Sequence, residues 1–328
     1  MICSAGGRTR VTEADLAARQ PTLYRILKRG FEQNCLPQAM LLYGSPRCDF
    51  RSIVRYIAES GGCQSGTFAC GKCDACRRFE SGVHPDYREV DGGDGGVKKE
   101  AINGLRDFFS LSAVEAEVKH RFYSIVDCQN MTEVAANALL KFLEEPSKGI
   151  TALLTCPSIE GVLPTIVSRC QTIKIEPLPR KEIFDSLAQD FGPESAYFLS
   201  DISGDMNRLV ALGGDADFQQ AVDMANDFIF AFDRSRVEAS FALLSAAQSS
   251  PSPKCYNFFL GDVSRFLGDT LAQDGLFGPY ASSIGHIGRE EADLVARMEL
   301  SLRESISMSK ANLSFTGVLA MLAEMLVS

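Results

Sequence analysis

The feature that most constrains the fold is an alternation of short apolar runs with amphipathic, helix-length segments over the first 178 residues. The strand-length runs lie at 38–43, 86–90, 121–126, 151–155 and 170–175. Apolar residues recur at intervals of three and four, as in helices, at 21–34, 97–111 and 132–145. Because strands joined through helices pair in parallel, this region is predicted to form an α/β domain with a parallel sheet.

The segment EPLP at 176–179 marks a predicted domain boundary, and no convincing strand follows it. We expect a small helical domain over 179–215 and a C-terminal helical bundle over 216–328. The chain has no run of 18 apolar residues, which predicts no membrane span, and a polar N-terminus, which predicts no secretory signal. A cytoplasmic protein is expected. The net charge of −9 argues against a protein that binds nucleic acid by its overall charge.

Four of the eleven cysteines lie within fourteen residues: Cys63, Cys70, Cys73 and Cys76. Four thiolates complete a tetrahedral zinc shell, which leaves no open position for an activated water. The pattern therefore predicts a structural zinc module at about 61–80. An iron–sulfur cluster is the main alternative, although the cysteine-proline step typical of ferredoxins is missing. Redox C-x-x-C chemistry would leave two cysteines unused, and His84 is a further candidate ligand.

The stretch LLYGSPRCDFRS, residues 41–52, has the strand–loop–helix layout of a phosphate-binding loop. Counted from Gly44, the G-x-x-x-x-G-K-[ST] pattern puts Asp49 at the second glycine, Phe50 at the lysine and Arg51 at the serine or threonine. A nucleotide would lose its main cation and face a carboxylate instead. Taken alone, the stretch is more simply an ordinary connection that binds nothing.

Further segments follow in the order expected of a nucleotide site. The strand at 122–127 ends in Asp127, where a carboxylate would hold Mg²⁺, but Cys128 occupies the position of the water-orienting glutamate. Thr155 ends the next strand, and Arg169 immediately precedes the last one. The order of these segments strengthens the hypothesis of a nucleotide-binding frame that has lost its chemistry.

Two of these segments carry a specific resemblance. VDCQNMTEVAANALLKFLEEP (126–146) followed by LPTIVSRC (163–170) resembles the clamp-loader subunits of bacterial DNA polymerase III. The cysteine cluster, LPQAMLLYG, HPDYREVD, GDMNRLVAL and the final segment ANLSFTGVLAMLAEML also fit that family, from about residue 20 to the end.

The resemblance implies an AAA+-type (P-loop NTPase-like) α/β domain with an inserted zinc module, followed by a helical lid domain and a helical collar. The family's ATPase subunits keep an intact lysine loop and an acidic second motif, whereas this chain has DFR and DCQN. It departs from them as the delta-prime branch does. The resemblance therefore implies a subunit of the DNA polymerase III holoenzyme that binds no ATP and has no ATPase activity of its own. The cysteine spacing is shorter than is usual in the family.

Within such assemblies the SRC arginine, here Arg169, acts in trans as an arginine finger on a neighbour's ATP, although a local salt bridge is the alternative. Arg208 is either a sensor arginine or a brace of the second domain, and Lys141 either contacts DNA or is merely solvated. The implied partners are gamma/tau-like ATPase subunits and a delta-like clamp opener, met through the collar and the Arg169 face, together with the sliding clamp and primed DNA. An active motor subunit and a zinc-stabilised adaptor outside replication remain alternatives.

Overall fold

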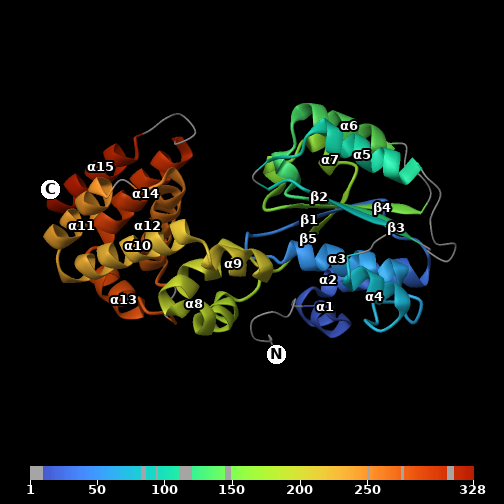
Figure 1. Ribbon diagram of the computed structural model, residues 1–328, viewed down its shortest axis with the longest axis horizontal. Helices are drawn as coiled ribbons and strands as arrows, with labels where there is room; N and C mark the ends of the chain where they lie inside the picture. Colours follow the sequence, from blue (N-terminus) through green and yellow to red (C-terminus); the bar gives the residue numbers. More distant parts are fainter. Residues whose placement is uncertain are drawn as a thin grey trace. The chain divides into compact units, whose positions relative to one another are not determined.

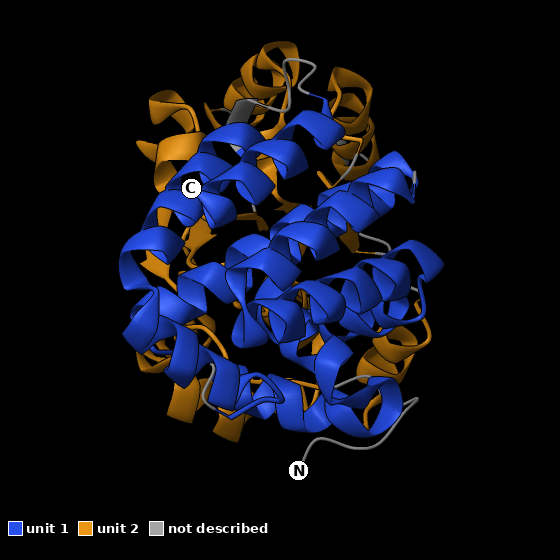
Figure 2. Cartoon of the chain, turned by 90° about the vertical axis from the view of Figure 1, so that its left-hand side faces the viewer, with its two compact units in different colours: residues 1–6, 179–328 blue, residues 7–178 orange. Residues whose placement is uncertain are grey.

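The computed structural model describes residues 10–82, 86–93, 95–110, 120–144, 149–249, 251–274, 277–308 and 314–328. Two compact units divide the chain between Leu178 and Pro179 (Figure 2). His84, weighed above as a metal ligand, lies outside the described residues. Among the helices of the described part, none is both long and apolar enough to cross a membrane.

The N-terminal unit is built on one five-stranded parallel sheet in the order β2-β3-β4-β1-β5 (Figure 1). Its strands are β1 (Ala39–Tyr43), β2 (Tyr87–Asp91), β3 (Arg121–Val126), β4 (Ile150–Cys156) and β5 (Gln171–Lys174). All four strand pairings of this sheet are parallel, which confirms the predicted parallel α/β architecture. The three central strands β1, β3 and β4 are buried almost throughout, as expected of a sheet covered on both faces.

Helices cover both faces of this sheet (Figure 1). On one face lie α1 (Glu13–Arg19), α2 (Pro21–Glu32), α3 (Phe50–Gly62) and α4 (Asp74–Glu80); on the other lie α5 (Lys99–Ser110), α6 (Glu133–Glu144) and α7 (Pro164–Val167). Single-turn 3₁₀ helices occur at Cys128–Asn130 and Ile159–Gly161. Thr132 begins α6 by accepting the backbone N–H of Ala135 at 3.2 Å, as its position before the predicted helix suggested.

Two apolar clusters hold the helical layers onto the sheet. One packs α5, α6 and α7 against β3 and β4, with Tyr123 stacked on Phe142 at 5.0 Å between ring centroids. The other packs α1, α2 and α3 against the opposite face, around Leu27, Ile57 and Phe122. The sheet is thus a rigid platform whose strand ends carry the connecting loops.

The C-terminal unit consists of helices in its described part. They are α8 (Arg180–Ile202), α9 (Met206–Gly213), α10 (Ala216–Arg234), α11 (Arg236–Gln248), α12 (Pro253–Ala272), α13 (Ala281–Glu290), α14 (Ala292–Met308) and α15 (Phe315–Val327). The expected short helices over 180–213 take the form of one long run, α8, and α9. The run is not continuous, because Gly192 adopts φ 80°, ψ 160° immediately before Pro193.

A buried ion pair fastens the first residue of α8 to α12. Arg180 donates to Asp269 at 2.6 Å, and the two side chains are only 4% and 12% exposed. The hydroxyl of Tyr197 also donates to Asp269, and Ser200 accepts from Arg180 Nε at 3.1 Å. Burial raises the pKa of Asp269, while the guanidinium of Arg180 opposes that shift.

Candidate functional site

The carboxyl ends of β1, β4 and β3 bring together residues that the sequence analysis singled out. Gly44 directly follows β1, and its N–H donates to the carbonyl of Cys156 at 3.4 Å. The N–H of Asp127, just after β3, donates to the hydroxyl of Thr155 at 3.2 Å. Ligands of open parallel sheets bind at the carboxyl ends of the strands, so these residues lie where a ligand of such a sheet would bind.

Asp49 occupies the N-terminus of helix α3. Its Oδ1 accepts the backbone N–H of Ser52 at 3.1 Å, which makes Asp49 the N-cap. A helix N-terminus at this position is where a phosphate would otherwise accept backbone N–H groups and meet the positive end of the helix dipole. Here the carboxylate of Asp49 accepts a backbone N–H and places a negative charge at the positive end of the helix dipole.

The neighbouring loop positions are also committed to contacts within the chain. A Cβ on Gly44 would lie 2.5 Å from the carbonyl oxygen of Ile175, so the glycine is needed for packing at the end of the sheet. Phe50 packs against the apolar cluster beneath α3. Arg51 donates to Glu89 at 2.7 Å and to Asp91 at 2.5 Å, both on β2.

The turn after β3 also lacks a side chain that a hydrolytic nucleotide site needs. Asp127 has a left-handed backbone (φ 54°, ψ 50°), and its Oδ1 accepts from Gln129 at 3.3 Å. Cys128 is 1% exposed and lies in the apolar cluster. A hydrogen bond with the thiol of Cys156, together with burial, holds the pKa of Cys128 above its usual range. A neutral buried thiol cannot orient water as a glutamate does.

Arg169 lies at the amino ends of the strands, opposite the ends that carry Gly44 and Asp127. It precedes β5, whose first residue Gln171 is paired with Met40 near the start of β1. Its side chain is exposed; Nη1 donates to the carbonyl of Thr165 at 2.9 Å and Nη2 to Glu144 at 2.5 Å. The structure therefore does not bring Arg169 to the loop of its own chain. The pairing with Glu144, 25 residues away, was not visible in the sequence.

The two weaker candidates are exposed. Lys141 lies on α6, and Arg208 lies in the first turn of α9, where its backbone N–H donates to the N-cap Asp205 at 3.3 Å. The position of Arg208 in this turn agrees with a bracing role as well as with a sensor role.

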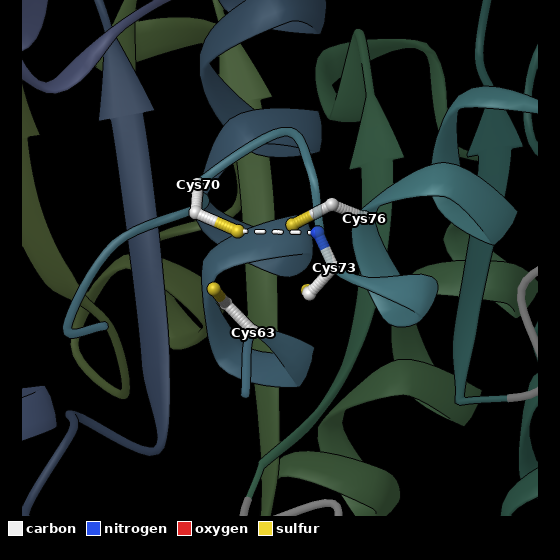
Figure 3. A group of neighbouring side chains, drawn as sticks. All are labelled: Cys63, Cys70, Cys73 and Cys76. Atoms are coloured by element: carbon white, nitrogen blue, oxygen red, sulfur yellow. Dashed lines mark hydrogen bonds between the residues drawn. The ribbon is translucent and has the colours of Figure 1, made fainter. Parts of the chain in front are cut away.

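The four clustered cysteines converge on one point (Figure 3). Cys63 ends α3, Cys70 lies on the following loop, Cys73 begins α4, and Cys76 is buried within it. The four Sγ atoms all lie within 4.8 Å of one another. The N–H groups of Lys72 and Cys73 point at Cys70 Sγ, at 3.5 and 3.4 Å.

This donor set fits a tetrahedral metal ion. Four thiols drawn together from one loop and two helix ends match the coordination of structural zinc, which needs no other ligand. The backbone N–H groups of Lys72 and Cys73 lower the pKa of Cys70 to about 6, so that this thiol is readily available as a thiolate. Gly71 between them has a left-handed backbone (φ +72°), as a tight knuckle requires.

The comparisons with known proteins find subunits of DNA polymerase III. A family model described as "DNA polymerase III, delta subunit" matches residues 19–179. The subunit delta' of DNA polymerase III from Bacillus subtilis is 35% identical over 204 residues, which are 62% of this chain and 61% of that protein. Over residues 19–179 the chain is therefore similar to subunits of DNA polymerase III of the clamp-loader family. A relative named delta' also comes from Haemophilus influenzae, at 29% identity over 194 residues that are 58% of each chain.

Other clamp-loader relatives are also similar. Subunit tau of Escherichia coli is 30% identical over 175 residues, covering 52% of this chain and 26% of tau. The chain therefore spans about three fifths of its delta-prime relative and about a quarter of tau. A gamma subunit-related protein of DNA polymerase III from Thermotoga maritima aligns over 92% of this chain and 99% of its own, with 17% identity and a TM-score of 0.47.

Proposed function

We propose that this protein is a delta-prime-like, non-hydrolysing subunit of the DNA polymerase III clamp loader. The observation that carries the proposal is the N-terminus of α3, where the carboxylate of Asp49 occupies the position that a nucleotide phosphate would need. Phe50 stands in place of the lysine and Cys128 in place of the glutamate, so neither phosphate binding nor hydrolysis is supported. On this proposal the AAA+-type frame persists as a scaffold.

Arg169 is assigned the role of an arginine finger that acts in trans. Its place at the amino ends of the strands supports this role, because a nucleotide held by the loop of the same chain would lie at the opposite, carboxyl ends. A planar guanidinium suits the task, since it spans two phosphate oxygens and stays charged. In the isolated chain Glu144 and the carbonyl of Thr165 hold the side chain until a neighbour docks.

The C-terminal helices are proposed to bind other subunits. Helix α11 exposes Val237, Phe241 and Leu244, which share one face at spacings of four and three. Phe241 is 67% exposed, more than Val237 and Leu244 of the same stripe, and an apolar stripe of this kind is typical of a protein–protein interface. We assign this stripe to the collar over 216–328 and the helices of 179–215 to the lid. The partners in this assembly are gamma/tau-like ATPases, a delta-like clamp opener, the sliding clamp and primed DNA.

The cysteine cluster is assigned a structural zinc ion. Its ligands would be Cys63, Cys70, Cys73 and Cys76, and the ion would tie the end of α3 to α4. A shell of four thiolates leaves no site for water, so the metal takes no part in any reaction.

The experiment that tests the proposal is steady-state ATP hydrolysis by the reconstituted loader with clamp and primed DNA. Arg169→Ala in this subunit alone should lower the rate roughly tenfold or more, the scale expected for a lost finger. Arg25→Ala, which removes an exposed arginine from α2, is the matched control and should leave the rate unchanged. Size-exclusion chromatography establishes that each variant assembles.

Unchanged hydrolysis by the Arg169→Ala complex would reduce this arginine to a partner of Glu144. The similarity to tau and gamma subunits supports a second candidate, an ATP-binding motor subunit with an unorthodox loop. That candidate requires saturable nucleotide binding by the isolated chain, which the favoured proposal excludes.

A further inference from the structure

Arg10, three residues before helix α1, lies against the cysteine cluster. Nη2 of Arg10 donates to Oε1 of Glu59, and the two side chains are 36% and 9% exposed. A Cβ built on Gly71 would lie 2.1 Å from Nη1 of Arg10. The guanidinium therefore rests directly on the backbone of the knuckle that joins Cys70 to Cys73.

Glu59 is the link between this arginine and the prospective metal ligands. It lies in the last turns of α3, four residues before Cys63, which directly follows the helix. Its carboxylate is hydrogen-bonded to the thiol of Cys76, which is fully buried. A largely buried carboxylate thus touches one ligand position and has its cationic partner in Arg10.

Arg10 offsets negative charge that Glu59 and the bound metal site would otherwise place close together. A divalent cation held by four thiolates carries a net charge of −2, and Glu59 adds another negative charge beside Cys76. Uncompensated like charges at a partly buried site are costly, whereas a hydrogen-bonded guanidinium offsets them. Two other cations of the module face solvent: Lys72 is exposed, and Arg77 is exposed and paired with Asp74 at 2.5 Å, whereas Arg78 is half-buried.

We propose that Arg10 and Glu59 form a positioning pair for the metal site. Arg10 neutralises Glu59, which would otherwise place an uncompensated negative charge beside the Cys76 thiolate, and it supports the Gly71 turn, so that the four thiolates stay converged. Neither residue is a ligand. The inference rests on the proposed zinc site, and it adds the segment before α1 to that site. Outer-shell contacts of this kind commonly change metal affinity by about 10- to 100-fold.

The test is zinc affinity of the full-length chain, measured by competition with a chromophoric chelator. Arg10→Met should weaken binding by about 10- to 100-fold, whereas Glu59→Gln should change it only a few-fold. The double variant Arg10→Met/Glu59→Gln should recover most of the loss, because it removes the uncompensated carboxylate. Lys72→Met removes the same charge from the same knuckle without this contact, and it should change affinity only a few-fold.

A second readout is the cadmium–thiolate charge-transfer absorbance, which reports how many thiolates bind each ion. It should indicate four in the wild type and fewer in Arg10→Met. Wild-type affinity in Arg10→Met, or a double variant as weak as Arg10→Met, would overturn the pair while leaving the zinc site standing. A wild-type chain that binds neither ion would overturn the zinc site itself and the pair with it.

Discussion

The N-cap of α3 gives a prediction whose size follows from the structure. Asp49→Ala removes the acceptor of the Ser52 N–H at 3.1 Å and a negative charge at the positive end of a 13-residue helix. Loss of a cap costs about 0.5–2 kcal/mol, and loss of a charge at an exposed helix end about 0.3–1 kcal/mol. The free energy of unfolding should therefore fall by about 1–2 kcal/mol.

For a unit of this size that change corresponds to roughly 2–8 °C in the unfolding midpoint. Differential scanning calorimetry of the full chain measures it, and hydrogen exchange of residues 50–53 assigns the effect to the first turn of α3. Asp49→Asn keeps an acceptor and loses the charge, so it should lose only the smaller part. Wild-type melting and exchange in Asp49→Ala would refute the capping role. Nucleotide binding should not appear, because Phe50 still replaces the lysine.

Three further predictions concern the helical unit. Arg180→Met leaves Asp269 buried without its cation and should lower the free energy of unfolding in urea by about 3–5 kcal/mol. The double variant Arg180→Met/Asp269→Leu should lose much less, and equal losses would contradict the pairing. Burial raises the pKa of Asp262 from 3.8 to about 7, so the folded state retains a proton that the unfolded state releases, and stability is lost as pH rises between these values. Asp262→Asn should therefore stabilise most at pH values above about 7 and progressively less toward 4; a benefit independent of pH would contradict this. Phe241→Ser should weaken co-purification with ATPase subunits yet change unfolding by at most about 0.5 kcal/mol, and undiminished assembly would remove α11 from the interface.

Much of the α/β unit was predictable because many of its strands and helices can be recognised from short stretches of sequence. The buried strands are apolar runs that end at residues such as Gly44 and Asp127, and α6 carries its cap, Thr132, and its apolar face within a few residues of sequence. Helix α1 was missed because a seven-residue helix buries only Leu16 and has too little periodicity to recognise.

The cysteine ligands of the candidate metal site were predictable from the sequence, whereas the ion pairs between residues distant in the sequence were not. Cysteine spacing alone indicated the cluster that the structure brings together. In contrast, Arg10 meets Glu59 across 49 residues and Arg169 meets Glu144 across 25, and no local pattern encodes such pairs. The loop residues could be recognised as wrong for a phosphate, but only the fold shows Asp49 used as a cap and Arg51 bound to β2.

The central claim is that this chain keeps the frame of a nucleotide site and binds no nucleotide. Titration calorimetry of the isolated wild-type chain with ATP and Mg²⁺ tests it most directly, with a gamma or tau ATPase subunit as the positive control. No saturable heat should appear up to millimolar ATP, while the control binds. Stoichiometric binding at micromolar ATP would contradict it and make this chain a motor subunit.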